Sequence, residues 1–113
     1  MQSNIIFHIA NTADVEHARN SGVYRCESLS NEGFIHCCEH SQLPGVVSRY
    51  YDGIDDLWLL MIDAEQLESA LIRENTMGNA ELFPHVYGPI AMQAVTEVLE
   101  FGLDSVERRA LIG

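Results

Sequence analysis

The chain has 113 residues, of which 47% are hydrophobic and 20% charged, so it is expected to form one globular domain over residues 1–113. Its 17 acidic and 6 basic residues give a formal net charge of -11, which opposes general binding to nucleic acids or to an anionic membrane surface. The basic residues are all arginines, so chemistry through a lysine Schiff base is excluded.

Cysteine usage and the apolar pattern point to a reducing, aqueous compartment. Cys26, Cys37 and Cys38 are odd in number, and residues 1–4 lack the basic and apolar regions of a secretory signal. The apolar runs are far shorter than the ~20 residues that cross a bilayer. We therefore expect free thiols, a cytoplasmic location and no membrane partner.

Hydrophobic patterning predicts short helices early in the chain and strands later, which favours an α+β fold. Thr12 and Ser41 are expected to cap two helices, and Gly22 fits the left-handed position after the first. Tyr50 is expected on the buried face of the second helix. Residues 57–62 are apolar on both faces, as in a central strand. The other predicted segments are strands at 5–9, 34–38, 70–74 and 94–101, a turn at 30–33, a polar loop with Gly78 at 75–83, and a C-terminal helix from 104.

Three of the five histidines lie in apolar surroundings, where an imidazole needs partners for two ring nitrogens. His8 lies within the predicted strand 5–9, His36 lies within the strand 34–38, and His85 follows Pro84. Taken singly, each is more simply a core histidine that bonds to a backbone carbonyl. Three such histidines in one small domain favour a common cleft that admits a ligand.

Two other arrangements of these residues would carry chemistry. His36, Cys38 and His40 share one face if the strand extends that far, so a three-ligand metal site is an alternative. No metal is expected, however, because the spacing lacks the paired cysteines of zinc sites. Cys37 or Cys38 with His85 would form a nucleophilic pair, whereas cysteines that only pack in the core are the simpler interpretation.

The segment 83–89 is unusually constrained, because it combines two prolines with a glycine. Proline fixes φ and Gly88 allows a close backbone approach, so the segment can hold a ring such as that of Tyr87 against a ligand, or form a turn that closes the sheet. Arg73 and Glu74 end the preceding predicted strand and point to opposite faces if extended. One of them should face whatever that sheet covers.

Four parts of the sequence form a recognisable pattern: Ile6-Phe7-His8-Ile9, Glu32-Gly33-Phe34-Ile35-His36-Cys37, Glu74, and Phe83-Pro84-His85-Val86-Tyr87-Gly88-Pro89-Ile90. This pattern resembles the family named domain of unknown function 952, from residue 5 to about residue 101, and the phrases around His36 and His85 are its most specific parts. The chain departs from the family where Val15 stands in place of a frequent tryptophan and Cys38 in place of the usual serine.

Members of this family look like ADP-ribosyltransferases, so the resemblance implies a compact split β-sheet with flanking helices and a cleft for NAD as substrate. It implies that His8 and His36 contact ribose hydroxyls. It also implies that Glu74, with Glu81 as the second choice, stabilises positive charge as the bond between nicotinamide and ribose breaks.

The remaining ligand contacts follow from the same resemblance. Phe34 or Tyr87 would form an aromatic wall for nicotinamide. Arg25 or Arg73 would meet the pyrophosphate. The full set of expected ligand-binding residues is Phe34, Arg73, His85, Tyr87 and Gly88.

Three functions are compatible with these features of the sequence. The first is binding of NAD or a related nucleotide, with ribosyl transfer or glycohydrolysis in a histidine-lined cleft. The second is a non-catalytic ligand-binding or protein-interaction module. The third is a metal-dependent enzyme that uses His36, Cys38 and His40.

Overall fold

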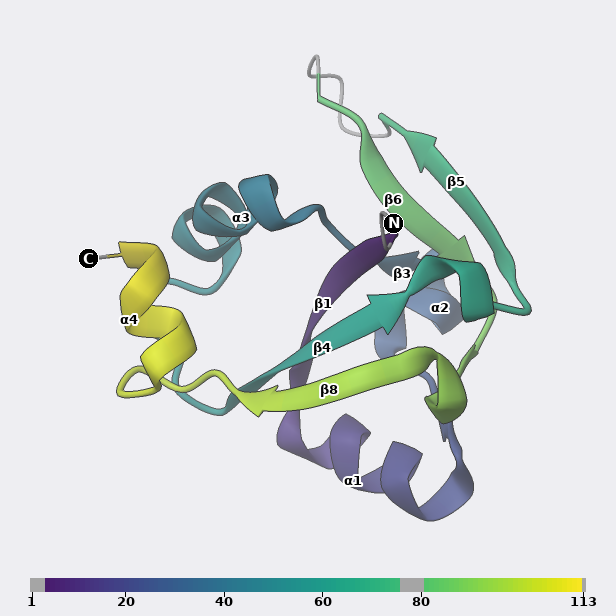
Figure 1. Ribbon diagram of the computed structural model, residues 1–113, viewed down its shortest axis with the longest axis horizontal. Helices are drawn as coiled ribbons and strands as arrows, with labels where there is room; N and C mark the ends of the chain where they lie inside the picture. Colours follow the sequence, from purple (N-terminus) through teal and green to yellow (C-terminus); the bar gives the residue numbers. More distant parts are fainter. Residues whose placement is uncertain (1–3, 76–80, 113) are drawn as a thin grey trace.

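The computed structural model describes residues 4–75 and 81–112, in which short strands and helices alternate (Figure 1). The centre of the predicted polar loop, with Gly78, lies outside these residues. In the part of the chain described, no helix is long and apolar enough to cross a membrane. The strands are β1 Ile5–Asn11, β2 Val23–Tyr24, β3 Ile35–His36, β4 Leu57–Asp63, β5 Ala70–Glu74, β6 Phe83–Tyr87, β7 Ile90–Ala91 and β8 Val95–Glu100. The helices are α1 Thr12–Ser21, α2 Glu27–Glu32, α3 Leu43–Tyr50 and α4 Val106–Ile112.

The strands of residues 4–75 and 81–112 form three small antiparallel sheets instead of one continuous sheet. β1, β4 and β8 lie side by side in that order, β2 pairs with β7, and β3, β6 and β5 form the third sheet. In Figure 1 the first sheet crosses the middle of the molecule, with α1 on one side and α3 and α4 near its far end. The predicted α+β class, with a split β-sheet and flanking helices, is confirmed at this level.

β4 is the central strand of its sheet, as its apolar sequence predicts. Leu60 pairs with His8 of β1 on one side and with Val98 of β8 on the other. Leu60 belongs to the same hydrophobic cluster as Val15 of α1, whereas its neighbour Leu59 belongs to a second cluster that includes Val47 of α3. Because alternate residues of a strand face opposite ways, both faces of β4 are buried.

α1 is capped by Asn11 and not, as predicted, by Thr12. The side-chain oxygen of Asn11 accepts a hydrogen bond from the backbone N–H of Asp14 at 2.8 Å. Thr12 is the first helical residue, and its hydroxyl accepts a hydrogen bond from Nε1 of Trp58 at 3.0 Å. Gly22 ends the helix with φ of +83°, as predicted.

The region before β3 differs from the prediction. The residues expected as a turn at 30–33 mostly belong to α2, which Gly33 ends with φ of +89°. α2 has six residues and no buried side chain, so it carries no apolar periodicity to detect. Within the predicted strand 34–38, only Ile35–His36 forms a regular strand, while Cys37 donates to the backbone oxygen of Pro84 and Cys38 forms an isolated bridge to Phe7.

The cap of α3 and the exposure of its last residue differ from the prediction. Ser41 does not cap the helix, because it lies inside a short 3₁₀ turn, His40–Gln42, that is capped by Glu39. Val47 is buried, as its helical spacing indicates. Tyr50, expected in the core, is 54% exposed, because it is the last helical residue and borders the cavity described below.

The constrained segment 83–89 forms a strand where a turn or a rigid ligand-holding loop was predicted. Phe83–Tyr87 is β6, the middle strand of the third sheet, with β3 and β5 as its neighbours. Gly88 follows directly, and a Cβ at this position would overlap the side chain of Ser69. Glycine is therefore required here by a close approach to Ser69.

α4 is attached to the rest of the protein by the buried side chain of Arg108, which is 1% exposed. Its Nη1 donates to the backbone oxygens of Ile54 at 2.7 Å and Phe101 at 3.0 Å, and its Nη2 donates to that of Tyr51 at 2.7 Å. Ser105 caps the helix, because its hydroxyl accepts from the backbone N–H of Arg108 at 3.1 Å. These bonds hold α4 beside α3 (Figure 1).

Candidate functional site

A cavity of about 540 Å³ is lined by residues of β1, β3 and β6 and of the first three helices. Its lining includes His8, His36 and His85, which are far apart in the sequence. Antiparallel pairing explains their convergence, because His36 of β3 lies opposite His85 of β6, and Phe7, next to His8, bridges Cys38. The three histidines singled out from the sequence therefore border one cavity.

His8 is buried, and both of its ring nitrogens have partners inside the protein. Nδ1 lies 2.5 Å from the backbone oxygen of His36, which can only accept, so Nδ1 carries the proton. Nε2 lies 2.7 Å from the hydroxyl of Tyr24, which therefore donates. Burial lowers the pKa of His8 and raises the pKa of Tyr24, so both groups are neutral near pH 7. His8 thus borders the cavity without a free ring nitrogen.

His36 is the most accessible of the three histidines, with 45% of its side chain exposed. Its Nε2 lies 3.1 Å from Oε2 of Glu32, the last residue of α2, which also lines the cavity. Its ring packs edge-on against Phe34, with 4.8 Å between ring centroids. A ligand in the cavity can therefore reach both the imidazole of His36 and the carboxylate of Glu32.

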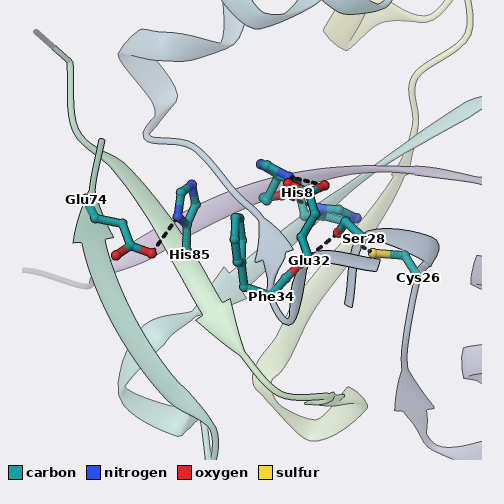
Figure 2. A network of polar contacts seen from close by, with 8 residues as sticks. His8, Cys26, Ser28, Glu32, Phe34, Glu74 and His85 are labelled. Carbon is teal, nitrogen blue, oxygen red and sulfur yellow. Dashed lines mark hydrogen bonds and ion pairs between the residues drawn. The ribbon is translucent and has the colours of Figure 1, made fainter. Parts of the chain in front are cut away.

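The ring of His85 is positioned by a hydrogen bond to Glu74 and by stacking against Phe34 (Figure 2). Its Nδ1 donates to Oε2 of Glu74 at 2.8 Å, and the hydroxyl of Tyr87 donates to the same oxygen. The hydrogen bond from Tyr87, and secondly that from His85, holds the pKa of Glu74 below its usual value. The ring of Phe34 stacks on that of His85 with 4.1 Å between centroids.

The other site residues expected from the sequence lie outside the cavity lining. Phe34 and Glu74 contact His85 instead, Tyr87 contacts Phe34 and Glu74, and Gly88 packs against Ser69 as described above. Nε of Arg73 donates to Oε2 of Glu39 at 2.7 Å, away from the cavity. Arg25 is exposed and is also absent from the lining.

The arginine that lines the cavity is Arg49 of α3, which was not among the predicted site residues. The available signal was its place two residues after Val47, next to the predicted apolar stripe of the helix. Tyr50, beside it, adds an exposed aromatic ring to the lining. Tyr24, the partner of His8, was missed as well, because nothing in a buried two-residue strand marks its hydroxyl.

The cysteines and the proposed metal ligands do not form a reactive centre. All three cysteines are free, and burial raises the pKa of Cys37 well above its usual value and that of Cys38 to about 12. Both thiols therefore stay protonated near pH 7, which opposes a nucleophilic pair with His85. Within residues 4–75 and 81–112, no three His, Cys, Asp or Glu side chains are placed to hold a metal ion, so His36, Cys38 and His40 do not converge on one.

The fold and the site together define an α+β domain in which small antiparallel sheets and helices enclose a histidine-bordered cavity. A family model described as "Protein of unknown function (DUF952)" matches residues 9–98, and the chain belongs to that family. The family resemblance inferred from the phrases around His36 and His85 is therefore confirmed.

Solved structures of protein CC0527 from Caulobacter crescentus, a Northeast Structural Genomics Consortium target, are similar to this chain over most of its length. Its crystal structure is 26% identical, with a TM-score of 0.81, and covers 97% of this chain and 100% of that chain. Its solution NMR structure is 30% identical, with a TM-score of 0.76, and covers 88% and 86%. No curated protein matches the chain.

Proposed function

We propose that this protein binds NAD or a related nucleotide in the cavity bordered by His8, His36 and His85, and acts on it by ribosyl transfer or hydrolysis. The observation that carries this proposal is the convergence of the three histidines on one cavity of about 540 Å³. That volume lies within the range of about 300–1,000 Å³ that is common for small-molecule sites. The resemblance to ADP-ribosyltransferases noted from the sequence supports the same ligand and an ADP-ribosyltransferase-like fold.

The lining offers a partner for each part of such a ligand. Arg49 supplies the positive charge that a pyrophosphate needs, in place of Arg25 or Arg73. Tyr50 offers a ring on which a base can stack, in place of Phe34 or Tyr87. His36 and Glu32 are accessible to ribose hydroxyls, which donate to a carboxylate and to an unprotonated ring nitrogen.

A non-catalytic binding module is the second candidate, and the surroundings of His8 and Glu74 favour it. Both nitrogens of His8 are engaged within the fold, and Glu74 lies outside the cavity lining. Two of the three groups expected to be catalytic therefore have no direct route to a ligand. This candidate predicts that NAD binds and is recovered unchanged.

Calorimetric titration with NAD tests the proposal. We expect wild-type protein to bind NAD, and His36→Ala and Arg49→Ala each to weaken binding about tenfold or more, because each removes a polar or charge-assisted contact worth about 1.5 kcal/mol or more. His17→Ala and Arg109→Ala are matched controls, since both residues are exposed and absent from the lining. Absence of heat at millimolar NAD, or equal weakening by the controls, would contradict the proposal.

A further inference from the structure

We infer that His85 is the group that accepts a proton in the cavity and that Glu74 is its positioning residue. This inference rests on the proposed function, because it takes NAD or a related nucleotide as the molecule in the cavity. It replaces the expected direct action of Glu74 with action through His85.

The hydrogen bonds determine which ring nitrogen of His85 is free. A carboxylate accepts and does not donate, so the 2.8 Å bond to Glu74 requires the proton to be on Nδ1. In the neutral imidazole, Nε2 then carries the lone pair. Figure 2 shows Nδ1 directed at Glu74, with the other ring nitrogen on the edge away from it.

His85 is 3% exposed and lines the cavity, and Nε2 is the ring nitrogen that remains to face it. No hydrogen bond joins Nε2 to the described residues. Among those residues, Nε of Arg108 is the only fully buried side-chain nitrogen or oxygen that lacks a partner, so Nε2 of His85 is not fully buried. His85 lines the cavity, whereas Glu74 does not. The ring therefore separates the carboxylate from the cavity and presents Nε2 to it, in contrast to His8, whose nitrogens are both engaged.

The surroundings fix the ring and balance the charge that it would gain. Phe34 stacks on its face, and His36 lies edge-on with 5.3 Å between centroids. The ionisable groups in contact with the ring are Glu74 from β5 and His36 from β3, and Tyr87 of the same strand as His85 bonds to Glu74. Tyr87 donates to the carboxylate of Glu74, so that carboxylate stays ionised and can stabilise an imidazolium.

For NAD hydrolysis, the step involves one water molecule and one proton transfer. The water oxygen forms a bond to C1′ of the ribose as the bond between C1′ and the nicotinamide nitrogen breaks. Nicotinamide leaves with that electron pair as a neutral pyridine, and the proton from the water passes to Nε2 of His85. The products are ADP-ribose and nicotinamide, and the imidazolium then releases the proton to solvent.

The test uses the full chain with NAD and measures binding by calorimetry and nicotinamide release in a single turnover. We expect His85→Gln to slow release about 10²–10⁴-fold, while the Kd for NAD changes less than about threefold. Added imidazole should restore part of the rate to His85→Ala. His17→Gln, an exposed histidine outside the cavity, should behave as wild type.

Glu74→Gln separates a positioning role from a structural one. Because a glutamine provides no counter-charge for imidazolium, the acidic limb of the pH–rate profile should move to lower pH, with kcat reduced and KM unchanged. Nitrogen NMR of the unliganded full chain should find the proton of neutral His85 on Nδ1. A proton on Nε2 would overturn the inference without any reference to NAD.

The outcomes distinguish this inference from the proposed function. If wild-type protein binds NAD but releases no nicotinamide, the role of His85 is overturned and nucleotide binding stands. If a folded His85→Gln variant keeps the full rate, the role of His85 is again overturned. If NAD does not bind, the proposed function fails, and the inference that rests on it fails with it.

Discussion

Arg108→Ala should lower the free energy of unfolding by about 3 kcal/mol or more. The guanidinium is buried and donates to the backbone oxygens of Tyr51, Ile54 and Phe101. The substitution leaves these oxygens without that donor and removes the cation that lies 5.5 Å from the centroid of the Phe101 ring. Urea denaturation followed by circular dichroism would register the change as a lower midpoint with a similar slope.

Arg109→Ala is the matched control, because Arg109 is exposed and occupies the next position of the same helix. Its expected effect is within about 0.5 kcal/mol. Both substitutions place alanine in α4, so a difference in helix propensity does not distinguish them. Equal effects of the two substitutions would show that the bonds of Arg108 do not hold α4 in place.

Stability should also fall as the pH drops below about 6.5, the ordinary pKa of histidine. Burial lowers the pKa of His8 in the folded state, so the unfolded chain binds a proton that the folded chain does not. The stabilisation is thus complete above the unfolded pKa and is lost as the pH falls toward the folded one. The slope contributed by this residue should approach about 1.4 kcal/mol per pH unit.

Comparison of variants between pH 5 and pH 8 isolates the contribution of His8. His8→Gln should lose this slope, whereas His17→Gln, altered at an exposed position, should keep it. The lowered pKa of Glu74 gives stability that is lost only as the pH falls below about 4.5, outside this window. Parallel stability curves for wild type and His8→Gln would refute the assignment of a neutral, buried His8.

The sequence predicted the parts of the fold that carry a repeated physical signal. The apolar run of β4 predicted a central strand because both of its faces are buried. Helices α1 and α3 were predicted from apolar spacing and capping residues, although Asn11 and not Thr12 caps α1. α2 and β2 were missed because segments of six and two residues are too short for periodicity to be measured.

The candidate site was predicted in part for a similar reason. Imidazoles in apolar segments need partners, so the sequence could single out His8, His36 and His85. It could not show that both nitrogens of His8 are engaged, since these partners depend on strand register and rotamers. Arg108 was missed because its hydrogen bonds join segments that are distant in the sequence. Arg49 was missed because a place beside the apolar stripe of α3 does not by itself show that a side chain lines a cavity.

A titration of isotope-labelled protein with NAD, followed by amide NMR, tests the central claim most directly. If the cavity is a nucleotide site, saturable shifts should concentrate at its lining, around β1, β3, β6 and the end of α3 near Arg49. Unchanged spectra at millimolar NAD, or saturable shifts confined to β8 and α4, would contradict it.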